Sequence, residues 1–426
     1  MDRNVSIKPA FTHISRSLLL SLLLASLPAT VAAQSFSVLY TFQWPGPVQP
    51  ASGVTIDAGG NLYGTTVSSY ASTGTVYKLS LRNGNWVSSV LFPFTGSNGD
   101  QPTARPVFGP DGSLYGTTMF GGFGCDLGCG NVYNLRPPAT FCPTARCYWT
   151  ASTVYDFDSI PDDGAGPAYG DLIFDAAGNI YGTTASNIIQ SGLQAGTVFE
   201  LSRSNGVWSE TILHQFGTLN DGSVPLSGLI RDHAGNLYGT TANGGSNSVC
   251  NGGRGCGTVY ELSPSAGGWT EQVLYSFQGQ SDGDTPVGGL VMDAAGNLYG
   301  TTSQDGANGG GTVFNLTHSN GNWSLATLYS FPRTGNGGGP NGNLLLDLAG
   351  NLYGTTSANG AYGYGAVFML THSNGNWVHS SLHDFTNGDD GAYPVGNPAF
   401  DANGSIYGTA SQGGAYLNGT IWKVAP

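Results

Sequence analysis

Positively charged side chains are scarce in this chain. Lysine and arginine number 13 among 426 residues, against 26 aspartates and glutamates. Removal of residues 1–33 as a signal peptide would leave 10 basic and 25 acidic residues, a formal net charge of −15. A negative field of this size disfavours nucleic acid and anionic lipid surfaces as partners. We therefore expect a protein that does not bind nucleic acid.

Long apolar segments are also scarce. The run Leu18–Leu24, broken only by Ser21, is too short to span a bilayer, and no later segment qualifies. The run follows three basic residues and precedes Val31-Ala32-Ala33, a small-residue cleavage site. This order predicts a signal peptide over residues 1–33 and a mature chain that begins near Gln34. We expect the mature protein to be secreted, displayed on the cell surface or held in the periplasm.

Cysteines are few, and each lies close in sequence to one other. An even number of cysteines in a secreted chain favours disulfides over free thiols. A zinc site is the alternative, but the chain has no paired CxxC motif and no histidine near the cysteines. We predict three local disulfides that close surface loops, Cys125–Cys129, Cys142–Cys147 and Cys250–Cys256.

Instead of a catalytic motif, the chain carries a repeat. No GxSxG, HExxH or Walker pattern is present. The stretch Asn61-Leu62-Tyr63-Gly64-Thr65-Thr66 recurs, identically or loosely, in seven places. Units repeated at such a period stack on their neighbours to bury a shared core. The seven tyrosines stand at positions 63, 115, 181, 238, 299, 353 and 407, between 52 and 66 residues apart.

Each repeat predicts four short strands. In the fifth repeat these are strand A (Val287–Asp293), strand B (Asn297–Thr302), strand C (Gly311–Thr317) and strand D (Trp323–Phe331). Short strands, tight turns and no helical period are typical of a four-stranded antiparallel blade. The Asn320-Gly321 pair suits a type I′ hairpin turn between strands C and D.

The two ends of the chain predict a closed ring. The last repeat stops after its strand C, Thr420–Val424, while Ser37–Phe42 resembles the strand D segment Ser89–Phe94. Pairing of Ser37–Phe42 beside Thr420–Val424 would complete the last blade and remove two exposed edges. We predict an all-β fold, a seven-bladed β-propeller that forms a single domain over residues 34–426, and we expect a monomer.

The strand order places the D–A and B–C loops on one rim. Aspartates in D–A loops are followed by glycine and proline, which favours plain turn chemistry. The alternative is a ring of oxygens that holds calcium or a cationic ligand, with no other cofactor expected. The candidate residues in these loops are Asp163, Asp221, Asp282, Asp284 and Asp390.

The B–C loops differ most between repeats and carry aromatic side chains among amides and glycines. Variable loops on a rigid ring are common binding sites, and aromatic rings beside amides suit the faces and hydroxyl edges of sugars. The alternative is that these rings pack on their own loops. The candidate ligand-binding residues are Tyr70, Phe120, Phe123, Tyr362, Tyr364 and Tyr416.

The placement of acid–base groups favours binding over catalysis. Histidines and glutamates fall on strands C and D or on the A–B and C–D turns, so we expect none on the D–A and B–C rim. The A–B turn aspartates repeat in six blades and are expected to cap turns. We predict a secreted, non-catalytic binding or scaffold propeller whose ligand is a glycan or an extracellular protein. The alternative is a carbohydrate-active hydrolase or lyase that uses the rim aspartates.

The repeat also resembles a known family. Asp293–Thr302 reads Asp-Ala-Ala-Gly-Asn-Leu-Tyr-Gly-Thr-Thr and is followed by Gly311-Thr312-Val313-Phe314. This pattern resembles the bacterial GloVer tandem repeat, named after gloeobacterial and verrucomicrobial proteins and typical of choice-of-anchor surface proteins. The resemblance covers Gln34–Pro426 and implies a secreted or surface-displayed bacterial protein, with no established activity to carry over. The chain departs from such proteins in having no recognisable C-terminal sorting anchor. More distantly, strands A and B are similar to NHL-type propeller repeats, whose members mostly bind rather than catalyse.

Overall fold

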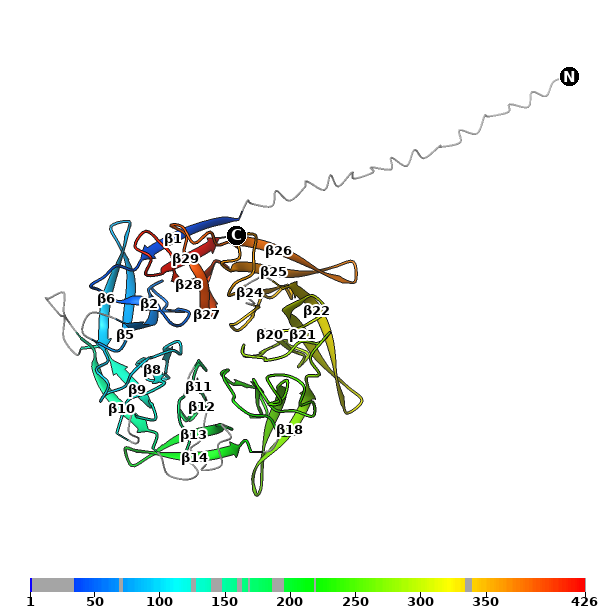
Figure 1. Cartoon of the computed structure of the whole chain (residues 1–426), viewed down its shortest axis with the longest axis horizontal. Helices are drawn as coiled ribbons and strands as arrows, with labels where there is room; N and C mark the ends of the chain where they lie inside the picture. The colour runs from blue at the N-terminus through cyan, green and yellow to red at the C-terminus, as the bar shows by residue number, and fades with distance from the viewer. Residues whose placement is uncertain are drawn as a thin grey trace. The chain divides into compact units, whose positions relative to one another are not determined.

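The computed structural model describes residues 1, 34–68, 72–123, 128–138, 148–158, 163–167, 169–185, 195–217, 220–333 and 339–425. The chain divides into two compact units, residues 1–33 and residues 34–426. The second unit is a seven-bladed β-propeller of antiparallel sheets set in a ring, as Figure 1 shows. No helix among the described residues is long and apolar enough to cross a membrane.

Each blade is one sheet. In blades 1 to 6 the strands follow the chain from the centre of the ring outward, and in blade 7 the outermost strand is β1. Blades 1 to 3 hold β2 (Val48–Pro50), β3 (Thr55–Ile56), β4 (Leu62–Ser68), β5 (Thr75–Arg82) and β6 (Asn85–Pro93); β7 (Val107–Phe108), β8 (Leu114–Thr118), β9 (Asn131–Arg136) and β10 (Thr150–Asp156); β11 (Ile173–Phe174), β12 (Ile180–Thr184), β13 (Thr197–Ser204) and β14 (Val207–Gln215). Blades 4 and 5 hold β15 (Ile230–Arg231), β16 (Leu237–Thr241), β17 (Thr258–Ser265) and β18 (Gly268–Ser276); β19 (Val291–Met292), β20 (Leu298–Thr302), β21 (Gly309–Ser319) and β22 (Asn322–Pro332). Blades 6 and 7 hold β23 (Leu345–Leu346), β24 (Leu352–Thr356), β25 (Ala366–Ser373) and β26 (Asn376–Asp384); β27 (Ala392–Phe400), β28 (Ile406–Gln412), β29 (Thr420–Ala425) and β1 (Ser35–Thr41).

The predicted closure of the ring is confirmed. β1 pairs antiparallel with β29, with Phe36 opposite Val424 and Thr41 opposite Thr420. The first strand of the unit formed by residues 34–426 is therefore the outermost strand of the last blade. Phe42, just after β1, is fully buried and meets the Tyr77 ring of blade 1 edge-on at 5.3 Å.

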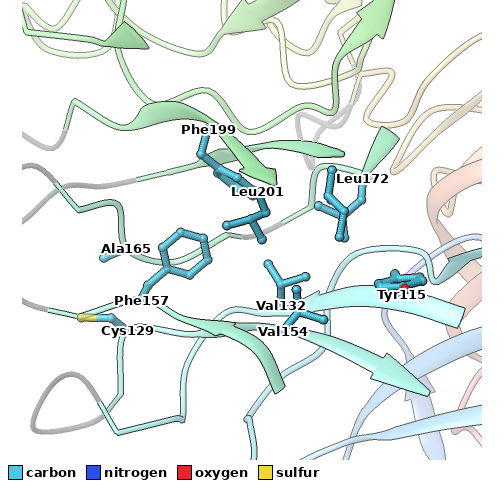
Figure 2. Packing of buried hydrophobic residues seen from close by; sticks show 10 residues of the cluster. Tyr115, Cys129, Val132, Val154, Phe157, Ala165, Leu172, Phe199 and Leu201 are labelled. Carbon is cyan, nitrogen blue, oxygen red and sulfur yellow. The ribbon is translucent and has the colours of Figure 1, made fainter. Parts of the chain in front are cut away.

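The core lies between blades, because each sheet presents apolar side chains to the next one. Figure 2 shows this for blades 2 and 3, where Phe157 and Phe199 meet edge-on with ring centres 5.3 Å apart. The cluster takes Val132 and Val154 from one sheet and Leu172 and Leu201 from the other. One blade alone leaves half of such a core exposed, so the blades depend on one another for stability.

Close packing explains the glycine in the Leu-Tyr-Gly-Thr-Thr motif. A Cβ at Gly64 in β4 would lie 2.3 Å from the Tyr77 hydroxyl oxygen of the neighbouring β5. The large ring of strand C thus lies directly over the glycine of strand B. Both side chains around it, Tyr63 and Thr65, are buried.

The aspartate, asparagine and tyrosine of the repeat form one hydrogen-bonded unit at the A–B turn. Asp293 accepts from the backbone N–H groups of Ala295 and Asn297, from Asn297 Nδ2 at 2.8 Å and from the Tyr299 hydroxyl at 3.1 Å. Burial alone would raise the pKa of Asp293, but these hydrogen bonds outweigh it and the pKa lies below its ordinary value. The prediction that these aspartates cap turns is confirmed.

Strand A is shorter than the sequence pattern predicts. In blade 5 only Val291–Met292 pair as a strand, although Val287–Asp293 was expected to do so. The preceding residues run beside the neighbouring blade: Gly289 N donates to Asn343 Oδ1 at 2.6 Å. Backbone groups near the axis therefore bond to the next blade instead of to their own sheet.

One predicted disulfide is seen in full. Cys250 and Cys256 are bonded and close a loop of blade 4. Cys129 is also disulfide-bonded. Cys125, Cys142 and Cys147 lie outside the described residues, so the other two predicted pairs remain predictions.

Candidate functional site

The central axis of the propeller holds a cavity to which every blade contributes. In each blade, the residue six positions before the first residue of the A–B turn has an equivalent place, in strand A or just before it. These seven side chains, with Asn343, Gly396 and Asn397, line a cavity of about 350 Å³. Ligand pockets commonly have volumes of about 300–1,000 Å³. The equivalent residues are Ala51, Thr103, Tyr169, Leu226, Val287, Asn341 and Val395.

Two residues further along each strand, the blades stop being alike. Three blades carry glycine at this position and four carry polar or charged side chains. Because all seven positions face the axis, the four polar side chains are brought toward one another. In blade order the residues are Gly53, Arg105, Asp171, Gly228, Gly289, Asn343 and Asn397.

These four polar residues form a hydrogen-bonded network that crosses the axis. Arg105 Nη2 lies 2.7 Å and Arg105 Nε 3.0 Å from Asp171 Oδ2. Asn397 Nδ2 donates to the same oxygen at 2.8 Å, and Asn397 Oδ1 accepts from Asn343 N at 2.8 Å. Asn343 Oδ1 in turn accepts from Gly289 N. Asp171 and Asn397 are each only 7% exposed, so the network is a fixed polar wall of the cavity on the side away from the D–A loops.

Tyr169 is the aromatic member of the cavity lining. It is 51% exposed and has a φ of 64°. A bulky residue in the left-handed region costs about 1–3 kcal/mol and is a feature of binding and active sites. Blade 3 has one more residue between Pro167 and its turn aspartate than the other blades have in this segment, and Tyr169 lies within that longer segment. The backbone N–H of Tyr169 donates to Thr103 Oγ1 of blade 2 at 3.4 Å.

Asn341 offers an unused acceptor beside the same cavity. Its Nδ2 donates to the carbonyl of Pro394 at 3.3 Å. Its Oδ1 is buried and has no hydrogen-bond partner among the described residues. A buried acceptor without a partner is costly.

The D–A loop aspartates predicted as ligand-binding residues bond to their own loops and to strand D. Asp282 Oδ2 accepts from the Tyr275 hydroxyl at 2.8 Å and from Gln278 N at 2.9 Å. Asp221 and Asp390 lie 3.1 Å and 3.0 Å from the Nε2 atoms of His214 and His383. Asp163 accepts from Asp158 N and Gly164 N. None of these four lines the central cavity.

The expectation that histidines and glutamates stay off this rim is wrong for three residues. His214 and His383 stand near the ends of β14 and β26 and reach the D–A aspartates, because the loop folds back over the end of strand D. Glu210 Oε2 lies 3.1 Å from the Tyr155 hydroxyl. Burial and the adjacent Asp163 raise the pKa of Glu210 to about 8.

The B–C loop aromatics do not share one location. Phe123, Tyr362 and Tyr416 are exposed, from blades 2, 6 and 7. Phe120 is half-buried, and its backbone bridges to Asp100. Tyr364 of blade 6 meets the ring of Tyr393 in β27 edge-on at 5.9 Å, so it packs against blade 7. Tyr70 lies outside the described residues, and none of the other five lines the central cavity.

A larger and more open hollow lies at the A–B turns of blades 5 to 7. Its volume is about 780 Å³, and its lining includes Asp293, Asp347, Asp401 and the exposed Leu348. The aspartates there are the repeated turn caps, whose oxygens already accept hydrogen bonds within each turn. This hollow therefore has few polar groups that distinguish one blade from another.

The axial residues were not predicted as site residues from the sequence, because they stand in the segment expected to be plain strand A and not in the variable loops. They are Arg105, Tyr169, Asp171, Asn341, Asn343 and Asn397. A break in the repeat could have indicated them. At one equivalent position the repeat has glycine in three blades and Arg, Asp, Asn and Asn in the other four.

Comparison with known protein families agrees with the repeat. A family model described as the Gloeobacter/Verrucomicrobia repeat matches residues 28–251 and 248–426. A search of the curated proteins finds no match to the chain.

Solved structures from several bacteria align with the chain at low identity. A putative oxidoreductase (glucose dehydrogenase) from Thermus thermophilus has 15% identity and a TM-score of 0.42, over 77% of this chain and 97% of that one. A putative 6-phosphogluconolactonase from Bacteroides uniformis has 14% identity and a TM-score of 0.47, over 78% and 84%. A mutant of NanB sialidase from Streptococcus pneumoniae has 12% identity and a TM-score of 0.43, over 91% and 70%. At these scores the likenesses carry no argument about activity.

Proposed function

The chain belongs to the Gloeobacter/Verrucomicrobia repeat family, and we propose that it is a non-catalytic binding propeller that holds the terminal sugar of a glycan in its central cavity. The observation that carries this proposal is the mixed lining of the cavity. Leu226, Val287 and Val395 contribute apolar side chains, and other lining residues present hydroxyl, amide and aromatic groups.

This lining suits the chemistry of a sugar ring. A pyranose has apolar faces and a rim of hydroxyls that both donate and accept hydrogen bonds. The exposed ring of Tyr169 supplies an apolar surface, and Asn341 Oδ1 supplies a buried acceptor without a partner among the described residues. Because the network below is fixed by its own hydrogen bonds, the cavity is organised before a ligand arrives, which lowers the entropic cost of binding.

The charges near the cavity favour binding over hydrolysis. Two carboxyl groups about 5–10 Å apart across the scissile bond are needed by most glycosidases. Among the described residues, those that line the cavity include no carboxylate. The nearest one in the network, Asp171, is occupied by Arg105 and Asn397.

One arrangement favours a hydrolase or lyase as the second candidate. Tyr155 lies between two carboxyl groups, 3.1 Å from Glu210 Oε2 and 3.5 Å from Asp163 Oδ1. A carboxyl group with a pKa near 8 beside a second carboxylate is a pattern that acid catalysts share. These groups lie on the outer strands β10 and β14 and on the D–A loop, away from the axis.

A glycan array followed by calorimetry of the bound glycans tests the proposal. We expect Tyr169→Ala and Asn341→Ala each to weaken binding at least tenfold. Tyr362→Ala is the matched control, since it removes an exposed tyrosine of the same rim outside the cavity, and we expect it to bind like the parent chain.

Two results would contradict the proposal. Loss of binding in Tyr362→Ala with retention in Tyr169→Ala would move the ligand to the B–C loops. Release of shortened sugars from the array glycans, abolished by Glu210→Gln, would establish the hydrolase instead. An extracellular protein as ligand would appear as binding to no glycan together with capture of a protein that Tyr169→Ala no longer captures.

A further inference from the structure

Two carboxylates from different loops meet beside the Cys250–Cys256 disulfide. Asp284 belongs to the D–A loop between blades 4 and 5, and Asp305 to the B–C loop of blade 5. An oxygen of each lies within 4.8 Å of the other and of Cys250 Sγ. We propose that Asp284 and Asp305 bind a calcium ion that joins these two loops. This site is separate from the central cavity and does not depend on the proposed function.

Burial of an unpartnered oxygen is the first observation that points to a ligand. Asp284 is 5% exposed, and its Oδ1 has no hydrogen-bond partner among the described residues. Asp282, two residues earlier, is 8% exposed and also has an Oδ1 without a partner among them. Buried carboxylate oxygens are normally hydrogen-bonded, ion-paired or bound to a metal. Two such oxygens in one short loop therefore call for a cation.

Comparison with the other blades gives the second observation. The backbone of Asp284 bridges to Gln304, as Asp100 bridges to Phe120 in blade 2 and Ser223 to Asn243 in blade 4. The residue after the bridge is Gly121 in blade 2 and Gly244 in blade 4, both with positive φ. In blade 5 it is Asp305, with a φ of 54°. Aspartate stands where glycine would fit with less strain, and blade 5 has a carboxylate on both sides of the bridge.

The electrostatics agree with a cation between the two groups. Burial raises the pKa of Asp284, and the charges of Asp305 and Asp282 add to the effect. A bound divalent ion would counteract this increase in the pKa of Asp284, because it would stabilise the charged form of the carboxylates. Asp305 Oδ2 also accepts from Gln280 N at 3.2 Å, which fixes the aspartate against the D–A loop.

The donor set selects the ion. Cys250 Sγ is bonded to Cys256 and offers no thiolate, so soft metals gain little here. Oxygen donors suit calcium or magnesium. Calcium accepts six to eight oxygens in irregular geometry, whereas magnesium requires a near-ideal octahedron. Two carboxylates with carbonyls and water fit calcium better, in the range of about 10⁻⁴–10⁻³ M found for extracellular modules.

Calorimetric titration of the chelator-treated chain with CaCl₂ tests the site. We expect one ion per chain, and we expect Asp284→Asn and Asp305→Asn each to weaken its binding at least tenfold. Asp100→Asn is the matched control, because Asp100 occupies the equivalent bridge position in blade 2, where Gly121 replaces the second carboxylate. This variant should bind like the parent chain.

Thermal unfolding without calcium separates lost binding from lost folding. Asp284→Asn removes a buried unpaired charge, so its unfolding temperature without calcium should equal or exceed that of the parent. The increase in unfolding temperature that calcium causes in the parent should disappear in this variant. No binding at up to about 10⁻² M CaCl₂ would overturn the site. Binding that persists in both aspartate variants would place the ion elsewhere and overturn it too.

Discussion

Asn397 Nδ2 donates a hydrogen bond to Asp171 Oδ2 at 2.8 Å, which joins two residues 226 positions apart in the chain. The same oxygen is bonded to Arg105, so blades 2, 3 and 7 meet at a single carboxylate. A contact of this kind exists only in a closed ring, and it positions Asn343 and Asn397 in the wall of the cavity.

Loss of the Asp171 charge should destabilise the propeller. Asp171→Asn would leave the Arg105 guanidinium, which is only 23% exposed, without its partner. Removal of one member of a buried pair costs about 3–5 kcal/mol, and we expect the lower end because Arg105 keeps some contact with water. Urea unfolding measures the change. The double variant Arg105→Ala/Asp171→Asn should be less destabilised than the sum of the single changes, and additive costs would show that the pair is not coupled.

Closure by β1 should be a major source of stability. Phe42 is fully buried between blade 7 and blade 1, so Phe42→Ala should lower the free energy of unfolding by about 3–5 kcal/mol. Leu81→Ala, at an exposed position of β5, is the control and should change it little. A small effect of Phe42→Ala would mean that the ring stays folded without a tightly packed last blade.

The repeated glycine of strand B should tolerate no side chain. Gly64→Ala would place a Cβ 2.3 Å from the Tyr77 hydroxyl oxygen, and overpacking of this kind costs about 1–3 kcal/mol. Gly217→Ala is the matched control, because no atom of the described residues lies within 4 Å of its added Cβ. Differential scanning calorimetry should show a lower Tm for the first variant only. Equal Tm values would mean that Tyr77 moves aside without cost.

Stability should fall as the pH rises through the range where Glu210 titrates. Burial raises the pKa of Glu210 from 4.5 to about 8, so the folded chain holds this proton more tightly than the unfolded chain. The stabilising contribution is complete below pH 4.5 and is lost as the pH approaches 8. Glu210→Gln should therefore unfold at a higher temperature than the parent at pH 8.5 and show a flatter profile between pH 5 and 8.5. Asp389→Asn, at an exposed carboxylate, should keep the parental profile, and a parental profile for Glu210→Gln would refute the assignment.

Local sequence patterns were sufficient to predict the blades. The Asp293, Asn297 and Tyr299 unit is complete within seven residues, so its turn could be recognised without knowledge of the remaining chain. The resemblance of Ser37–Phe42 to a strand D likewise predicted the pairing of β1 with β29. Strand A was predicted less well, because its backbone groups bond across blades and leave only two paired residues in most of them.

The candidate site could not be predicted in the same way. Tyr169, Asn341 and Asn397 come from three blades and gain a common role only because the ring brings their strands to one axis. The pairs His214–Asp221 and His383–Asp390 form because a loop folds back over the end of its strand, which depends on the conformation of that loop.

The amino-acid sequence by itself determined the blade, the number of blades and the place where the ring closes, because turn capping and strand patterning are local and are repeated seven times. The tertiary structure decided which side chains meet. Arg105, Asp171 and Asn397 become neighbours only after all seven blades have packed, since each blade rotates its first strand toward the same axis. Hydrogen bonds within a turn depend on a few adjacent residues, whereas those across the axis depend on the geometry of the whole ring.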